Sequence, residues 1–490
     1  MSDTDSTEAF RKIFSASCRP PPLSRDAAAA PADWVLLEPL AYVADQRNAT
    51  TAEASSSTGH TVQVTVCLTD PLGVSYVCVH CPGFKDTDYA ARPSIVCSEK
   101  DFLLLSVIFL SGPQGREYFV YKAGPGRPSL QLIPGPYPRV LTASDFGLLP
   151  SEDGDHFVLA TLCFGLSPWV YDLHLFSSRT WAWSTKEPQT EISSAVRTQV
   201  SPIVTSKVIQ LGGGTLGWVD LWRGIMVCNV LDEMPILRFI TLPMLMPGNK
   251  EGVKPCAWRL RNVAYSNGLI KFIEIEKHER PDVDERSYDD MDTLYESDCL
   301  EKPKEVGWRA MTWYRMTSWD HWRKGCMAYD KEISVDCQRH STLLPELTAS
   351  RDHGLCKGCM AYDKETLVDY PRHSKLLPGL RDNNARVLTL KDLLASHPVL
   401  SLTCHCDDVV YMLCKPKSCN PKSWLITVDL KKKILVELAP FSLEGYFSSA
   451  HPSELSSYLN TAPATEVLQG PEKELAIKTC VLLQGPSSSS

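Results

Sequence analysis

The densest group of metal-binding side chains lies in the C-terminal part of the chain, where Cys404, His405 and Cys406 are followed by Cys414 and Cys419. Thiolate and imidazole groups are ligands that zinc prefers, and four of them within 16 residues could close a tetrahedral site. In a strand, however, Cys404 and Cys406 share one face and can simply pack in a core. Structural zinc sites more often carry two well-formed Cys-x2–4-Cys pairs, so we favour packed thiols and expect neither a metal nor another cofactor.

Two further Cys-x-x-Cys pairs, Cys78–Cys81 and Cys356–Cys359, raise the question of zinc or redox chemistry. Residues three apart in a strand point to opposite faces, so the first pair cannot share a metal unless the strand turns at Cys81. In the second pair, Cys356 corresponds to Arg323 in a duplicated copy of the same segment. We therefore interpret both pairs as structural thiols, because reduced cysteine is commonly buried.

A glycine-rich stretch from Gly212 to Gly217 satisfies the pattern G-x-G-x-x-G of dinucleotide-binding folds and follows a strand-like run, Val208–Leu211. That pattern binds a pyrophosphate only when a helix N-terminus comes next. Here the sequel, Trp218–Trp222, has another strand pattern. The sequence thus predicts a tight turn between two strands.

Other catalytic patterns fail or are missing from the sequence. The acidic stretch Asp282–Arg286 lacks the ligands and the glycine of a calcium loop, because Arg286 and Ser287 stand at its fifth and sixth positions. No G-x-S-x-G or H-E-x-x-H motif occurs, and the 12 histidines are dispersed. The tryptophan-rich run is more typical of core and interface packing than of a ligand cage; its members are Trp308, Trp313, Trp319 and Trp322. We predict no catalytic residues and no enzyme activity.

The elements that position these residues are predicted to be strands. Short runs with alternating polarity, bounded by Gly, Pro, Asn or Asp, recur through more than 350 residues. They include Thr61–Leu68, Gly73–His80, Phe102–Leu110, Glu117–Lys122, His156–Phe164, Trp169–Phe176, Val204–Leu211, Ile236–Leu242, Trp308–Met316 and the hairpin Trp424–Leu430 with Lys433–Leu438. Helices are expected only at Leu390–Ser396 and Glu454–Leu459.

Serial hairpins without intervening amphipathic helices exclude a doubly wound α/β fold. Strand modules recur about every 45–60 residues, which suits the four-stranded blade of a β-propeller, an array of small antiparallel sheets that leaves only short edges exposed. We therefore predict a mainly β, propeller-like fold. The alternative is a pair of β-sandwiches.

The composition of the chain indicates which classes of partner it can bind and which cellular compartment it occupies. The chain of 490 residues is 43% hydrophobic and 22% charged, with a net charge of −8, and its densest basic run is Lys431–Lys433. So few clustered cations disfavour nucleic acid. The 18 cysteines are scattered and follow no secretory signal, which favours the reducing cytoplasm or nucleus. The longest apolar run, Phe102–Leu110, is too short to span a bilayer as a helix, so we expect no membrane association.

The predicted body runs over residues 32–460, between tails at 1–31 and 461–490 whose composition predicts disorder. An acidic segment at 277–305 is expected to be an exposed loop. Residues Lys324–Leu347 and Lys357–Leu380 match at 18 of 24 positions, which indicates a tandem duplication. Only one copy can fill the original packing site, so the other should be extruded.

Several segments together resemble a plant family of unknown function, DUF1618, which is much expanded in grasses. They are Trp34–Thr50, Ser75–Gly83, Gly217–Leu231, Pro235–Pro243, Trp308–Trp313 and Ser396–Leu402. The resemblance covers roughly residues 33–460, and Asp220–Gly224 (DLWRG) is its most specific part. The strand rhythm is also similar to F-box-associated and kelch propellers, although no F-box precedes Trp34.

The family has no established activity, so the resemblance implies no mechanism. Abundant β scaffold without an assembled catalytic group favours a protein-interaction scaffold with an unidentified protein partner. The alternative is a zinc protein or an enzyme that uses the Cys404–Cys419 cluster or a central cavity.

Overall fold

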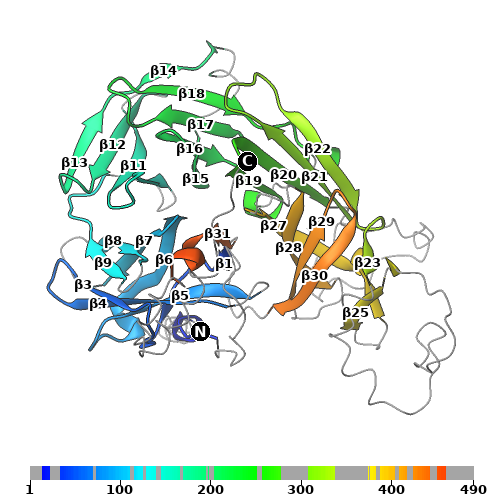
Figure 1. The fold of residues 1–490 in the computed structure, drawn as a ribbon, viewed down its shortest axis with the longest axis horizontal. Helices are drawn as coiled ribbons and strands as arrows, with labels where there is room; N and C mark the ends of the chain where they lie inside the picture. Colours follow the sequence, from blue (N-terminus) through cyan, green and yellow to red (C-terminus); the bar gives the residue numbers. More distant parts are fainter. Residues whose placement is uncertain are drawn as a thin grey trace, which may run out of the picture.

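The fold is a ring of small antiparallel sheets, seen in a computed structural model of the chain (Figure 1). The structure describes residues 14–21, 34–69, 73–110, 115–124, 128–138, 145–165, 169–194, 197, 203–250, 256–277, 307–336, 373–374, 376–381, 387–402, 408–416, 423–441 and 450–459. Within these ranges, six sheets of four to six strands form the six blades of a β-propeller. The predicted propeller-like fold is therefore confirmed, and the paired sandwiches are not found.

Blade 1 joins both ends of the described chain, and blades 2 and 3 are four-stranded meanders. Blade 1 contains β1 (Val35–Leu37), β2 (Tyr42–Val43), β3 (Ala52–Ser55), β4 (Thr61–Cys67), β5 (Val74–His80) and β31 (His451–Ser453). Blade 2 contains β6 (Tyr89–Glu99), β7 (Phe102–Phe109), β8 (Arg116–Lys122) and β9 (Ser129–Leu132). Blade 3 contains β10 (Phe146–Pro150), β11 (Phe157–Phe164), β12 (Tyr171–Ser177) and β13 (Ala182–Lys186).

Blades 4 to 6 complete the ring. Blade 4 contains β14 (Gln189–Glu191), β15 (Lys207–Gln210), β16 (Thr215–Asp220), β17 (Gly224–Asn229) and β18 (Ile236–Thr241). Blade 5 contains β19 (Arg261–Ser266), β20 (Leu269–Lys277), β21 (Trp308–Arg315) and β22 (Arg323–Tyr329). Blade 6 contains β23 (Ser334–Asp336), β24 (His373–Ser374), β27 (Leu393–Leu400), β28 (Val409–Pro416), β29 (Ser423–Asp429) and β30 (Ile434–Phe441). Strands β25 (Leu376–Arg381) and β26 (Val387–Thr389) form a separate pair.

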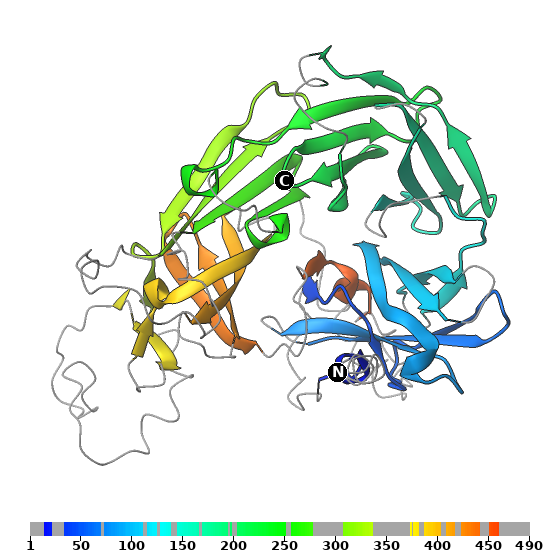
Figure 2. The same cartoon turned by 180° about the vertical axis from the view of Figure 1, so that it is seen from behind.

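The innermost strands close the ring around a centre. Strand β6 contacts β10, β10 contacts β15, β15 contacts β19, β19 contacts β27, β27 contacts β31, and β31 returns to β6. Strand β31 also pairs antiparallel with β1, with Val35 opposite Ser453 and Leu37 opposite His451. Segments from the two ends of the described chain therefore share one blade, which Figure 2 shows from behind.

The apolar run of β7 illustrates why a blade strand is apolar on both faces. Leu103, Leu105 and Val107 pack against blade 1, whereas Phe102 and Leu104 pack against blade 3. Because each blade is covered by a neighbour on both sides, the polarity of its strands does not alternate as it would in a sheet with one solvated face. The predicted buried strand at Phe102–Leu110 is confirmed as β7.

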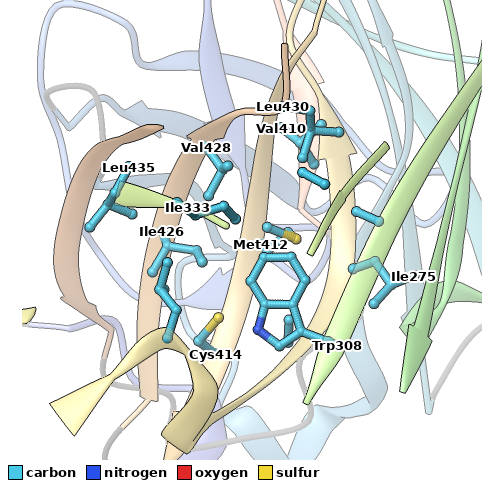
Figure 3. Packing of buried hydrophobic residues seen from close by; sticks show 14 of the residues in the cluster. Ile275, Trp308, Ile333, Val410, Met412, Cys414, Ile426, Val428, Leu430 and Leu435 are labelled. Atoms are coloured by element: carbon cyan, nitrogen blue, oxygen red, sulfur yellow. The ribbon is translucent and has the colours of Figure 1, made fainter. Parts of the chain in front are cut away.

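Blades 5 and 6 meet in the largest apolar cluster (Figure 3). Trp308 of β21 packs there against side chains of β28 and β29, including Met412, Cys414 and Ile426. All four side chains are at most 1% exposed. Burying a side chain of this size contributes about 1.5–3 kcal/mol, so this contact is a principal link between the two blades.

The helical elements are few and short. In the described ranges they include the 3-10 turns η1 (Asp86–Asp88), η3 (Pro247–Asn249), η4 (Ala257–Arg259) and η7 (Leu390–Asp392), and the helix α3 (Leu455–Leu459). The predicted helix at Glu454–Leu459 is confirmed as α3. The one predicted at Leu390–Ser396 is wrong. Thr389 does form a capping box with Asp392, but the turn ends there, because the following residues pair with β28 as the innermost strand of blade 6.

Candidate functional site

The glycine-rich stretch forms the turn between β15 and β16. Gly212, Gly213 and Gly214 have φ values of 81°, 56° and 80°, a region that glycine enters without a steric penalty. The Thr215 amide donates to the Gly212 carbonyl over 3.0 Å, and β16 begins directly there. Because a strand follows and not a helix, the turn lacks the helix N-terminus that a dinucleotide needs, as the sequence predicted.

The cysteines of the first Cys-x-x-Cys pair lie in different apolar clusters. Cys78 packs with Tyr42, Cys67 and Tyr76, whereas Cys81 packs in the core between blades 1 and 2. Both are 1% exposed, which suits structural thiols. The hydrogen-bonded neighbour Cys67 and burial raise the pKa of Cys78, and burial raises the pKa of Cys81. These thiols stay protonated and cannot share a metal.

The other cysteine candidates lie largely outside the described residues. This holds for Cys356 and Cys359, and for Cys404, His405, Cys406 and Cys419. Cys414 is described and belongs to the core of blades 5 and 6, where it is 0% exposed. Among the residues that the structure describes, no group of three or more His, Cys, Asp or Glu side chains is placed to hold a metal.

The tryptophan-rich run divides between the core and the surface. Trp308 and Trp313 are 1% and 7% exposed, whereas Trp319 and Trp322 are half-buried at the end of the β21–β22 hairpin. We call residues 316–322 the tryptophan turn. Arg323 lies 4.2 Å from the ring centroid of Trp319, and the Trp322 Nε1–H donates to the Thr241 carbonyl over 2.7 Å. The two indoles are thus held in fixed positions beside exposed Met316.

The segment Asp220–Gly224 (DLWRG) forms the turn between β16 and β17. Oδ1 of Asp220 accepts the backbone amides of Trp222 and Arg223, and Oδ2 accepts the amide of Val204 and a guanidinium N–H of Arg223 at 2.7 Å. A Cβ at Gly224 would lie 2.4 Å from the Ile240 carbonyl oxygen, so only glycine fits. The side chains of Asp220 and Arg223 and the absence of one at Gly224 are therefore explained by the turn and its neighbouring strands.

A cavity of about 910 Å³ lies at the centre of the ring. It is lined by the ends of the innermost strands β6, β10, β15, β19 and β31, together with the glycine turn at Gly212–Gly214. Apolar side chains such as Val96, Leu149 and Val208 alternate there with Glu99, Lys207 and His451. Volumes of this size are typical of ligand sites.

One end of the cavity carries basic groups on an aromatic support. The Lys207 Nζ donates to Oδ1 of Asn262 over 2.7 Å and lies 5.7 Å from the ring centroid of Trp258. The imidazole of His451 meets the same indole edge to face, with 6.5 Å between the ring centroids. Asn262 is fixed in turn, because its amide donates to the Pro398 carbonyl over 2.7 Å.

Dense protein surroundings shift the ionisation of these groups, although each side chain touches the cavity and is only half-buried. Desolvation lowers the pKa of Lys207 to about 7. Desolvation, and then the charge of Lys207, lower the pKa of His451 to about 4. At neutral pH, therefore, the histidine is neutral and the lysine is only about half charged.

Acidic groups approach the cavity from β6 and the residue after β31. Desolvation, and then the charge of Glu454, raise the pKa of Glu99 to about 8. Nearby, the hydroxyls of Ser98 and Ser453 share a hydrogen bond of 2.7 Å, which joins β6 to β31. Glu99 is thus mostly protonated at neutral pH and can donate a hydrogen bond.

Sequence reasoning proposed a central cavity but missed its polar residues. Glu99, Lys207 and His451 belong to three blades and lie more than one hundred residues apart in the chain. The local signal is weak: Glu99 and Lys207 occur in strands that also carry apolar residues, such as Val96 and Val208. No helix in the described ranges combines the length and the hydropathy needed to cross a membrane.

The chain matches one family model over part of its length and is distantly similar to a solved structure. Residues 218–411 match the model of a family described as "Protein of unknown function (DUF1618)", which covers β16 to the middle of β28 and less than half of the chain. No curated protein matches. Among solved structures, the chain is similar to the crystal structure of the WD40 domain of SCAP from fission yeast, with 10% identity and a TM-score of 0.29. That match covers 81% of this chain and 74% of the other.

Proposed function

We propose that this chain is a non-catalytic scaffold that binds a protein partner through the tryptophan turn of blade 5. The observation that carries the proposal is the fixed, partly exposed pair of indoles at Trp319 and Trp322, with arginines stacked on them and exposed Met316 beside them. Trp, Arg and Met are enriched in protein interfaces, and Trp and Arg are frequent energetic anchors there.

Rigidity supports this assignment. Arg315, which is 7% exposed, donates to the carbonyls of Met316 and Trp319, so the turn is fixed from within. Trp322 is tied to blade 4 through Thr241. A preorganised aromatic surface loses little conformational entropy when a partner binds, which favours affinity.

Quantitative native purification from the tissue of origin tests the proposal. The wild-type chain should recover one protein at near-stoichiometric amounts, and Trp319→Ala or Met316→Asp should weaken its binding by about 30-fold or more, as expected for an interface anchor. Met234→Asp is the matched control, because Met234 is 68% exposed on blade 4. Equal recovery by all variants, or no stoichiometric partner, would contradict the proposal.

A cytoplasmic or nuclear location in a plant cell belongs to the same proposal, supported by the scattered thiols and the family resemblance. A fluorescent fusion that entered the secretory pathway would contradict it.

The alternative function, a zinc protein, is tested by measuring the metal content. Elemental analysis of purified protein should find well below one zinc per chain, since structural sites are normally filled.

A further inference from the structure

We propose that the central cavity is a binding site for a small organic carboxylic acid, whose carboxylate pairs with Lys207 while its apolar part lies against the apolar lining. This site is separate from the tryptophan turn and does not depend on the proposed partner binding. It is assigned from the cavity and from the contacts of Lys207.

Lys207 is an amine with spare hydrogen-bond donors. An ammonium group has three N–H donors. In the part of the chain that the structure describes, the Nζ of Lys207 has one hydrogen-bond acceptor, the neutral amide of Asn262, and no carboxylate within ion-pair distance. Lys207 is one of the residues that line the cavity of about 910 Å³, so its remaining donors are available to a molecule bound there.

The electrostatics of Lys207 also favour an anionic ligand. A cation that is largely shielded from water normally has an anionic partner, because the loss of its hydration is unfavourable. Here desolvation lowers the pKa of Lys207 to about 7, which is the consequence of having no such partner. A bound carboxylate would supply the missing charge, raise the pKa of Lys207 again and so bring a proton with it.

The charges around the cavity favour a carboxylate over a phosphate. Besides Lys207, the lining holds the carboxyl groups of Glu99, Glu152 and Glu454 and the cations Lys100 and Arg179. The other titratable side chains of the lining are those of His156, His451, Cys97 and Tyr265. Glu99 is mostly protonated, and the charges of Glu152 and Glu454 are matched in number by those of Lys100 and Arg179. Lys207 in its protonated form therefore supplies one further positive charge, which balances a monoanion but not a dianionic phosphate.

The rest of the cavity fits an apolar body. Val96, Leu149, Val208 and Ile209 contribute aliphatic surface, and Tyr265 contributes an aromatic ring. On the acidic side, protonated Glu99 can donate to a polar group at the far end of the ligand. The class of molecule that this arrangement suits is an amphipathic acid with a compact ring or chain.

Calorimetric titration of the full chain with three probes, benzoate, 2-naphthoate and the neutral isostere 2-naphthamide, tests the assignment. Near pH ~6.5, where Lys207 is largely protonated, 2-naphthoate should bind about tenfold or more tightly than 2-naphthamide, as a charge-assisted hydrogen bond provides. Lys207→Met should abolish that preference. Lys207→Arg should retain it. Lys85→Met, at an exposed lysine that does not line the cavity, is the matched control that should leave it unchanged.

Proton uptake on binding gives a second readout. Near pH ~8 the wild-type chain should take up close to one proton per 2-naphthoate bound, and near pH ~6 almost none, because Lys207 is then already charged. Glu99→Gln should keep most of this uptake, whereas Lys207→Met should lose it. If Lys207→Met melts well below the wild-type chain, Lys207→Gln takes its place in both experiments.

Three outcomes would overturn the inference. One is equal affinity for 2-naphthoate and 2-naphthamide, or a preference that survives Lys207→Met. A second is failure of both acids to bind at concentrations up to about 10 mM, which corresponds to negligible affinity. The third is tighter Lys207-dependent binding of inorganic phosphate than of either acid, which would assign the site to a phosphate.

Discussion

Arg261 and Lys207 are cations on neighbouring blades that differ in burial and in electrostatic partners. Arg261 of β19 is 1% exposed, and its guanidinium lies 2.8 Å from the Glu274 carboxylate, donates to the Leu221 carbonyl and stacks on Phe272. Lys207 of β15 also lies over an aromatic ring, but its acceptor is a neutral amide. Among the described residues, the arginine has a carboxylate as its countercharge and the lysine has none.

This difference indicates a structural role for Arg261 and a ligand-binding role for Lys207. Arg261 joins β19 to the segment after β18, because its partner Glu274 also accepts the Met246 amide at 3.0 Å and the Asn249 side chain at 2.7 Å. Lys207 holds nothing comparable and faces the cavity, so its desolvation destabilises the fold unless a ligand compensates it.

The largest effect is expected from breaking the compensated pair. Glu274→Ala removes the countercharge of Arg261 and the oxygen that accepts hydrogen bonds from Met246 and Asn249, and should lower the free energy of unfolding by about 3–5 kcal/mol. Urea unfolding measures this directly. The matched control is Glu191→Ala, which breaks the exposed pair with Arg238 and should cost about 1 kcal/mol or less. A loss as small as that at Glu274 would contradict the distinction between the two cations.

Substitution of Lys207, in contrast, is expected to raise the free energy of unfolding. The pKa of Lys207 is about 7 in the folded chain and near the ordinary 10.5 when unfolded, so the unfolded state binds more protons between these values. Stability from this group therefore rises with pH from about 7 to about 10.5. Lys207→Met removes the penalty and should stabilise the chain below pH 7 by on the order of 1 kcal/mol, discounted for solvent in the cavity, and by nothing above pH 10.5.

Urea unfolding at several pH values checks this second prediction, with exposed Lys100→Met as the control. If Lys207→Met destabilised the chain at every pH, Lys207 would be a structural cation like Arg261.

The sequence predicted the blade strands well where turns and polarity agree. The hairpin around Lys431–Lys432 occurs as β29 and β30, and the glycine turn at Gly212–Gly214 lies between two strands. The prediction from sequence failed where pairing with a distant strand decides the secondary structure. Leu390–Ser396 has a helix cap and helical spacing, yet pairing with β28 makes most of it a strand. The three-residue strand β31 is too short to be recognised without the ring that it closes.

The cavity could not be located from sequence for a similar reason. Lys207 and His451 come together only because β31 returns to the centre beside β6 and β27. Neither residue has a motif around it, and the pKa of each depends on desolvation by blades that are distant in sequence. By contrast, the expectation that Cys78 and Cys81 point in different directions needed only local strand geometry, and the two side chains do lie in different apolar clusters.

The most direct test of an uncompensated amine in the central cavity is an NMR titration of Lys207, with 13C at its Cε and Lys207→Met to assign the signal. We predict a pKa of about 7 in the protein alone and a clear increase when 2-naphthoate is bound. A pKa near the ordinary value of 10.5 without ligand, or one that 2-naphthoate does not change, would contradict the account.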